Sequence, residues 1–497
     1  MTEISLTVET PTKLRISGLD DQRYHLEQCL RYVDKKVQFE VQKNQNNSWL
    51  RKKMGYEKFG EYLDLLRKKM NGSLLFSDEK GFWTYTGMAA DLSKRFSTPV
   101  KNVVVYPKTK PLPWLKPPKH TTRPYQEDII SLLQEIKHGA VEVGTGLGKS
   151  LCIVQLVRNY GLKTVVMAPS ANIAKQLFEE LRTHLGKKYV GFFGDGKKES
   201  GKLIVVAIDD SLARVKPGTP AYKDLIKTKV FIADESHICA AATLQTICMG
   251  VMGDAPIRHF FSATQMRNDG LDLVLEAITG PIVYSMTVQQ GVEQGYLAKP
   301  QFIMINTYSS SDFYSKDSNE MTRNHFYYNN SIAKTAADLA NNAVTSLGHQ
   351  VVILVEEVEQ FTKLLPYLKH SVRFAHGGVS KDNKDKVPEE YHDSDTTALV
   401  DSFNAGEYSI LVGTSCISTG TDIRPVQTII NLRARTSEIT HKQAVGRGTR
   451  LVPGKTEFFF FDFLVENIEK MKEHAAKRLE IYQNIYPDVR TVTYKAL

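Results

Sequence analysis

The sequence predicts an α/β protein with two tandem parallel-sheet domains, preceded by a small mixed α/β segment. Two observations lead to this prediction. From about residue 140 onward, short apolar runs of strand length alternate with segments of helical length, an order typical of a parallel sheet covered by helices. Before them, residues 107–118 contain five prolines, which resist helix formation and sheet pairing alike, so this stretch is predicted to be a linker.

The predicted domain boundaries follow from these observations. The N-terminal segment is residues 1–110, the proline-rich linker 111–120, the first α/β domain 121–298 and the second 299–497. At roughly 100–200 residues per domain, a chain of 497 residues is long enough for this division.

Hydrophobic periodicity assigns the individual elements. In the N-terminal segment we expect helices at Tyr56–Met70 and 87–95, and a helix that runs into a strand at 26–39. The first α/β domain is expected to have strands at residues 140–143, Thr164–Ala168, 203–208, Val230–Ala233 and 259–262, and helices at 151–159 and 171–184. The second is expected to have a helix at 331–346 and strands at Gln350–Val355, Val372–Ala375, 409–412 and 428–431.

The composition excludes several classes of protein. A net charge of +9 indicates a polyanionic partner, either nucleic acid or an anionic membrane surface. The longest apolar runs are far shorter than the roughly 20 residues of a membrane-spanning helix, and the N-terminus lacks a signal-peptide pattern. The five cysteines form no C-x-x-C pair and have no zinc-finger spacing. We therefore expect a cytoplasmic protein without disulfides or a structural zinc ion.

A glycine-rich loop at residues 143–150 follows an apolar strand and opens a helix. Such a loop wraps backbone N–H groups around phosphate oxygens, and the helix N-terminus behind it favours negative charge. Lys149 is expected to reach the β- and γ-phosphates of ATP, and the Ser150 hydroxyl to ligate Mg²⁺. The expected nucleotide-binding residues are Gly144, Thr145, Gly146, Leu147, Gly148, Lys149 and Ser150. Val143 occupies a position where the full pattern has glycine, so a chance glycine-rich turn is the alternative.

A second candidate site lies where the apolar strand Val230–Ala233 ends in two carboxylates, Asp234 and Glu235. In phosphate-loop NTPases an aspartate at a strand end holds Mg²⁺, a role that suits Asp234. Glu235 could orient or deprotonate the attacking water. The alternative is an acidic cap between a strand and a helix, which is common on α/β surfaces. A phosphate loop in the same domain favours the catalytic interpretation.

A third candidate site is basic and lies far along the chain, at residues 443–450. Arg447 and Arg450 are three residues apart and are expected to share one helix face. Arginine is a forked, permanently charged donor that suits phosphate, and it can stabilise the charge that develops on the γ-phosphoryl group. A solvated basic helix face is the alternative interpretation.

In order and spacing, these elements resemble the motifs of superfamily 2 helicases over residues 121–462, about two thirds of the chain. The resemblance implies two RecA-like domains that bind ATP between them and nucleic acid across their top. It assigns adenine recognition to Arg123 and Gln126, nucleic-acid contacts to Pro169, Ser170 and Thr414, coupling to His237, Ser262 and Thr264, and ATP contacts to Gly420, Asp422, Gln443, Arg447 and Arg450. Residues 208–211 depart from the Thr-x-x-Ser element of many members, which puts the strand contacts of the first domain in doubt.

The acidic motif reads Asp-Glu-Ser-His, unlike the Asp-Glu-Ala-Asp of the DEAD-box RNA helicases. Together with residues 293–300, it looks like the DNA-acting members: the XPB-like and restriction-motor branches and the phage helicases of the UvsW type. Size and the small N-terminal domain are most similar to the UvsW type. The resemblance implies an ATP- and Mg²⁺-dependent DNA helicase or translocase. Forked or junction DNA with a single-stranded tracking strand is the expected substrate, and the host cytoplasm the expected location for a phage protein.

Three other functions stay open at the level of sequence. The same motor motifs serve RNA helicases, and ATPase stimulation by branched DNA or by RNA would separate the two. A translocase subunit of a restriction-type complex would need a nuclease, for which the sequence has no convincing constellation of residues. A non-enzymatic nucleic-acid-binding protein with a degenerate nucleotide fold would release no phosphate, and the intact Lys149, Asp234, Glu235 and Arg450 count against it.

The N-terminal segment carries basic and aromatic residues outside the motor motifs. Basic side chains neutralise phosphates and aromatic rings stack on unpaired bases, so we expect an accessory nucleic-acid-binding domain. The alternative is a solvated basic surface over an aromatic core. The residues in question are Lys35, Lys36, Arg51, Lys52, Lys53, Arg67, Lys68 and Lys69, with Trp49, Tyr56, Phe82, Trp83 and Tyr85.

Overall fold

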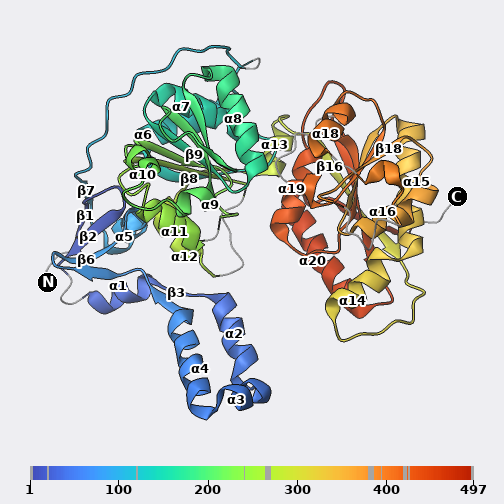
Figure 1. Cartoon of the computed structure of the whole chain (residues 1–497), viewed down its shortest axis with the longest axis horizontal. Helices are drawn as coiled ribbons and strands as arrows, with labels where there is room; N and C mark the ends of the chain where they lie inside the picture. The colour runs from blue at the N-terminus through green and yellow to red at the C-terminus, as the bar shows by residue number, and fades with distance from the viewer. Residues whose placement is uncertain are drawn as a thin grey trace. The chain divides into compact units, whose positions relative to one another are not determined.

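The computed structural model describes most of the chain. The residues outside the description are 1–3, 19–21, 119–120, 240, 264–269, 379–385, 393–394, 418–422, 424–425 and 494–497. The chain divides into two compact units (Figure 1): Met1–Val143 with Lys149–Ser285, and Gly144–Gly148 with Met286–Leu497. Among the described residues, no helix is both long and apolar enough to cross a membrane.

The N-terminal segment is built on a five-stranded sheet in the order β5-β6-β2-β1-β7. Its strands are β1 Ser5–Val8, β2 Lys13–Ser17, β5 Phe76–Asp78, β6 Gly81–Tyr85 and β7 Val100–Asn102. Buried and more exposed side chains alternate along β1 and β2, as expected for a sheet with one face on a core. Helix α1 (Arg23–Cys29), the short helix η1 (Thr86–Met88) and α5 (Ala89–Phe96) complete it.

Three helices extend this segment into an arm, which Figure 1 shows as a projection from the N-terminal sheet. They are α2 (Lys35–Gln45), α3 (Ser48–Met54) and α4 (Tyr56–Met70), joined at the base by the paired strands β3 (Arg31–Val33) and β4 (Asn71–Ser73). Helix α4 has the predicted bounds. The stretch at 26–39 is divided into α1, β3 and α2, because Asp34 caps a new helix by accepting from the Lys36 and Val37 amides.

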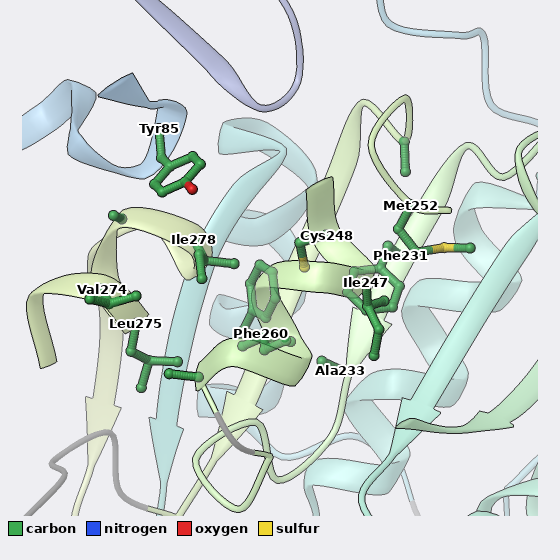
Figure 2. Close-up of a cluster of buried hydrophobic side chains, with 14 of the residues drawn as sticks. Tyr85, Phe231, Ala233, Ile247, Cys248, Met252, Phe260, Val274, Leu275 and Ile278 are labelled. Atoms are coloured by element: carbon green, nitrogen blue, oxygen red, sulfur yellow. The ribbon is translucent and has the colours of Figure 1, made fainter. Parts of the chain in front are cut away.

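The N-terminal sheet shares a hydrophobic core with the first α/β domain. Figure 2 shows Tyr85 beside the residues of that core, and the Tyr85 hydroxyl accepts a 2.5 Å hydrogen bond from Gln245 Nε2. A Cβ on Gly87 would lie 2.3 Å from the carbonyl oxygen of Glu276, so this close approach requires glycine. The proline-rich stretch is also attached, since the Lys110 and Leu112 amides donate to carbonyls at the end of α7 (Lys149–Tyr160).

The first α/β domain has an eight-stranded sheet in the order β11-β10-β12-β9-β13-β14-β8-β15. The pairs from β10 to β8 are parallel, as predicted, and β11 is antiparallel to β10. The strands are β8 His138–Val143, β9 Thr164–Ala168, β10 Val190–Gly194, β11 Lys197–Lys198, β12 Ile204–Ile208, β13 Val230–Ala233, β14 Ile257–Ser262 and β15 Ile282–Met286. The helices are α6 Pro124–Ile136, α7, α8 Ala171–Leu185, α9 Asp209–Ala213, α10 Pro220–Leu225, α11 Ala241–Met249 and α12 Asp272–Thr279.

The second unit contains a seven-stranded sheet in the order β18-β19-β17-β20-β21-β16-β22, with every described pair parallel. Its strands are β16 Lys299–Thr307, β17 Gln350–Val355, β18 Val372–Ala375, β19 Ile410–Gly413, β20 Val426–Leu432, β21 Glu457–Val465 and β22 Val489–Thr493. The principal helices are α13 Val288–Glu293, α14 Ser318–Thr322, α15 Asn330–Leu347, α16 Val358–Leu364, α18 Thr396–Asn404, α19 Glu438–Gly448 and α20 Glu469–Ile485. The predicted fold class, two tandem parallel-sheet domains behind a small mixed α/β segment, is confirmed.

Candidate active site

One edge of the first sheet gathers most of the predicted site residues of this unit. Strands β9, β13, β14 and β8 are successive parallel neighbours, so their carboxyl ends lie at the same edge. Ligands of open α/β sheets bind outside this edge. The residues that follow these ends are Pro169 and Ser170 after β9, Asp234 and Glu235 after β13, and the loop Gly144–Gly148 after β8, while Ser262 is the last residue of β14.

The glycine-rich loop turns sharply from β8 into α7. Gly146 and Gly148 have φ values of +87° and +77°, a left-handed conformation that favours glycine. Val143, which departs from the family pattern, is a buried residue of β8, and its carbonyl accepts a 3.2 Å hydrogen bond from Lys149 Nζ. The substitution is therefore accommodated in the strand, ahead of the turn itself. Within the second unit, Thr145 Oγ1 donates to the Lys442 carbonyl at 3.2 Å.

Lys149 and Glu235 form an ion pair, with Nζ and Oε1 3.1 Å apart. Their side chains are only 10% and 14% exposed, so water screens the pair weakly. Glu235 has a φ of +48°, a left-handed conformation that is uncommon for a residue with a side chain. Such conformations concentrate at functional sites, where surrounding contacts hold them in place.

The two neighbouring carboxylates differ in their electrostatics. Burial, together with the charge of Glu235, raises the pKa of Asp234 to about 7. Burial would also raise the pKa of Glu235, but Lys149 and His237 outweigh it and lower that pKa. The charge of Lys149 also acts on Asp234, but it lowers the pKa of that carboxyl by less than burial and Glu235 raise it. The Asp234 carboxylate and the Ser150 hydroxyl on α7 are hard oxygen donors of the kind that Mg²⁺ prefers, so the residue types fit this ion.

A series of close polar contacts leads from Glu235 to the end of β14. His237 Nδ1 lies 3.5 Å from Glu235 Oε2 and 2.5 Å from Ser262 Oγ. His237 and Ser262 are buried, and the Ser236 amide donates to the Phe261 carbonyl at 3.0 Å. The predicted coupling residues His237 and Ser262 are therefore brought together, and Thr264 lies outside the described residues.

Other predicted residues of the first domain have structural partners. Gln126 is buried, and its Oε1 accepts from the Arg123 amide at 2.9 Å, which fixes the start of α6. Ser170 Oγ caps α8 by accepting from the Ile173 amide. Residues 208–211, the departure noted in the sequence, end β12 and begin the short helix α9.

The basic motif of the second unit begins on α19, where Gln443 and Arg447 lie. Burial, with a contribution from Arg433, lowers the pKa of Arg447 to about 10. The expectation that Arg447 and Arg450 share one helix face is wrong, because α19 ends at Gly448 and Arg450 follows the helix. Thr414 follows β19, and its amide donates to the Ala375 carbonyl. Gly420 and Asp422 lie outside the described residues.

Sequence analysis missed a buried polar network beneath α19. Asp462 accepts from Arg478 Nε at 2.9 Å and from the Tyr482 hydroxyl at 2.5 Å. Tyr482 also lies 2.9 Å from Nδ1 of His441, a residue of α19. A signal was present in the sequence, since Asp462 is a lone charge within the apolar run of β21, and such a charge requires a partner.

Comparisons with known proteins agree with this fold. Residues 119–267 match the model described as "Type III restriction enzyme, res subunit", and residues 335–452 match "Helicase conserved C-terminal domain". The chain is a superfamily 2 helicase, an enzyme that hydrolyses ATP. Its relatives among known proteins include helicases of viruses, one of them a bacteriophage.

Particular relatives are distant in sequence. "Probable helicase D10" of Escherichia phage T5 is 23% identical over 377 residues, covering 74% of this chain and 76% of that protein. The structure of UvsW from phage T4 covers 99% of both chains at 13% identity and a TM-score of 0.43. The restriction-modification enzyme LlaBIII bound to DNA gives a TM-score of 0.55 at 11% identity, covering 76% of this chain and 32% of that one. The last likeness shows the fold alone.

Proposed function

We propose that this helicase is a DNA-dependent motor that unwinds or branch-migrates forked and junction DNA in replication, recombination or repair. The observation that carries the motor part is the largely buried Lys149–Glu235 ion pair, from which polar contacts continue through His237 to Ser262. It joins a residue of the phosphate-binding helix to the ends of two neighbouring strands. In this proposal an event at the phosphate is transmitted through these polar contacts to the edge of the sheet.

In this proposal ATP replaces Glu235 as the partner of Lys149. The ammonium group then faces the β- and γ-phosphates, and the released Glu235 carboxylate orients the attacking water and accepts its proton. Ser150 and Asp234 would hold Mg²⁺, and the ion would supply positive charge against the phosphates. A buried aspartate whose pKa is raised to about 7 supports a cation at this position.

The remaining roles are those that the superfamily 2 motifs imply. Arg123 and Gln126 recognise adenine, and Gln443, Arg447 and Arg450 contact the γ-phosphate, together with Gly420 and Asp422. Burial lowers the pKa of Arg450. Pro169, Ser170 and Thr414 contact the nucleic-acid strand, and His237, Ser262 and Thr264 couple hydrolysis to movement.

Three observations favour DNA over RNA as the track. The acidic motif is Asp-Glu-Ser-His, the first domain matches a restriction-enzyme subunit, and LlaBIII, a structural neighbour, is bound to DNA. The net charge of +9 suits either polyanion. We also propose that it acts in the cytoplasm, that of the host if the chain is phage-encoded, because viral helicases are among its relatives.

The test is one ATPase assay with a panel of activators at fixed salt. Fork, four-way junction, linear duplex, single-stranded DNA and single-stranded RNA are compared, because affinity for any polyanion depends strongly on salt. The proposal expects the largest stimulation from the fork and the junction. Stronger stimulation by RNA would make the chain an RNA helicase, and equal stimulation by plain duplex would make it a translocase without a preference for branches.

A further inference from the structure

The arm of α2, α3 and α4 holds itself together with little apolar burial. Val41, Phe59, Leu63 and Leu66 are the apolar residues of these three helices that become buried. Polar contacts add to them, since the Tyr62 hydroxyl donates to Glu40 Oε1 at 2.8 Å. The arm therefore keeps its shape while most of its surface faces solvent.

That surface is strongly basic. Residues 35–70 contain ten lysines and arginines and four acidic residues, a surplus of six within a chain whose net charge is +9. Six of the cations lie in the last turns of α3 and α4, where the helix dipole favours them: Arg51, Lys52, Lys53, Arg67, Lys68 and Lys69. The dipole explains where these cations are tolerated, but it does not explain the aromatic rings that accompany them.

Three large aromatic side chains of the arm are exposed to solvent. The exposed fractions are 67% for Phe39, 65% for Trp49 and 82% for Tyr56. Trp49 and Tyr56 lie on α3 and at the start of α4, where the arm turns, and we call this region the tip. Lys53 Nζ is 4.9 Å from the Trp49 ring, and the Arg51 guanidinium is 5.8 Å from the Tyr56 ring. The tip thus presents open ring faces beside cations.

This combination discriminates between kinds of partner. Protein interfaces are depleted in lysine, so a surface with eight lysines is a poor fit for a protein partner. Single-stranded nucleic acid is bound by aromatic faces that stack on bases and by cations that follow the backbone. Helix α4 has 15 residues and is about 22 Å long, which spans about six base pairs at 3.4 Å each.

We propose that the tip stacks on bases exposed at a DNA branch point, through Trp49 and Tyr56, while the basic flanks of α2 and α4 follow the phosphates of an adjoining duplex arm. This assignment rests on the proposed function and gives it a physical element for recognising branches. The aromatic residues noted in the sequence therefore fall into two groups. Phe82, Trp83 and Tyr85 belong to strand β6 of the N-terminal sheet, whereas Trp49 and Tyr56 are exposed to solvent on the arm.

Trp49 provides a direct optical test. The other two tryptophans are packed, Trp83 on Phe76 and Trp114 on Arg158, and their replacement by phenylalanine leaves Trp49 as the single tryptophan. A synthetic four-way junction should quench Trp49 fluorescence at saturation, and a relaxed, covalently closed circular duplex, which exposes no bases, should not. Equal quenching by both DNAs, no quenching during demonstrated junction binding, or quenching by anionic vesicles in preference to DNA would overturn the proposal.

Variants of the tip test its contribution to affinity. Replacing Trp49 and Tyr56 together by alanine should weaken junction binding by roughly 5- to 150-fold for each stacked ring and reduce the preference for the junction over the circle. Tyr24→Ala is the matched control, because Tyr24 is 74% exposed and lies on α1, outside the arm. An unchanged preference in the double variant, or the same loss in the control, would contradict the stacking role.

The cations are tested separately through salt dependence. Lys52→Gln with Lys53→Gln should lower the slope of log affinity against log salt by about 0.9 for each lost phosphate contact, with the junction preference retained. Lys187→Gln with Lys188→Gln, an exposed lysine pair outside the arm, should leave the slope unchanged. Equal slopes for the two double variants would show that Lys52 and Lys53 of the arm do not contact DNA phosphates.

Excision of the arm provides a variant that does not depend on single side chains. The Asp34 amide already donates to the Met70 carbonyl at 2.8 Å, so replacing residues 35–69 by Asn-Gly closes β3 and β4 with a two-residue turn. The shortened protein should unfold cooperatively and lose its preference for junctions. If it keeps that preference, the arm inference fails. If instead no DNA stimulates wild-type ATP hydrolysis, the proposed function fails.

Discussion

The replacement Asp462→Asn tests how strongly the network beneath α19 stabilises the second unit. The side chains of Asp462 and Arg478 are each 1% exposed, so bulk water cannot solvate the Arg478 cation once the Asp462 charge is removed. Breaking a buried pair by removing one partner costs about 3–5 kcal/mol, because the remaining ion is uncompensated. The weaker bond from the Tyr482 hydroxyl to a neutral amide adds to this loss. We therefore expect the free energy of unfolding of the second unit to fall by at least about 3 kcal/mol.

Hydrogen exchange in urea measures this loss locally, at the amides of β21 and α20, without assuming that the two units unfold together. The control is Asp462→Asn combined with Arg478→Met, which removes the stranded cation and should restore most of the stability. A loss below about 1 kcal/mol in the single variant, or no recovery in the double variant, would refute the argument from the buried charge.

The same network has a consequence for catalysis. His441 of α19 lies between the Tyr482 hydroxyl and the Arg435 carbonyl, at 2.9 and 2.7 Å. Tyr482→Phe removes one hydroxyl and no ring volume, so the helix that carries Gln443 loses an anchor with little change in packing. We expect kcat to fall more than KM changes, because the helix would be misplaced for the γ-phosphate. An unchanged kcat would make the network structural only.

Four further predictions concern single side chains. Lys149→Ala should abolish ATP turnover while DNA binding in a filter assay persists, and near-normal turnover would reject the phosphate-loop role. Glu235→Gln should lower single-turnover hydrolysis by about 10²–10⁴-fold with ATP affinity retained, and a collapse of that affinity would make Glu235 a ligand instead. Arg450→Ala should lower kcat by about 10³-fold or more, whereas a change of a few-fold would place Arg450 away from ATP. Burial, with Arg450, lowers the pKa of Lys455 to about 7 from an ordinary 10.5, so wild-type stability should fall as pH drops between these values. Lys455→Met should remove that slope and gain up to about 4 kcal/mol at pH 7 in urea unfolding, and an equal slope in both proteins would contradict it.

The accuracy of the sequence predictions follows the strength of the local signal. Strands Thr164–Ala168 and Val230–Ala233 have the predicted bounds, because each is a continuous apolar run that both faces of a parallel sheet bury. Strand β10 was missed, since its sequence Val-Gly-Phe-Phe-Gly begins and ends near glycines that resemble turns. Its place beside β12 depends on pairing between distant segments, which periodicity does not encode.

Site residues show the same division between local and tertiary information. Motif spacing was sufficient to nominate Lys149, Glu235, His237 and Ser262, and the structure brings these four together. The end of α19 was not predictable from the two arginines, because the spacing of three residues fits a helix that continues. It ends at Gly448, where a Cβ would lie 2.1 Å from the Phe458 ring, a restriction set by tertiary packing.

The packing of the N-terminal segment decides which part of it can be separated from the motor. Its sheet packs against the first α/β domain in one hydrophobic core, in which Tyr85 lies near Val274 and Ile278 (Figure 2). A deletion of the residues up to about 110 would expose this apolar surface to water. Loss of activity in such a truncation would report damage to the domain that contains Lys149, whatever the segment binds. The arm, in contrast, is connected to the rest of the N-terminal segment through the two paired strands β3 and β4. Its helices pack their apolar residues against one another. Substrate selection by the N-terminal segment is therefore a question for variants of the arm, in which the catalytic domain keeps its core.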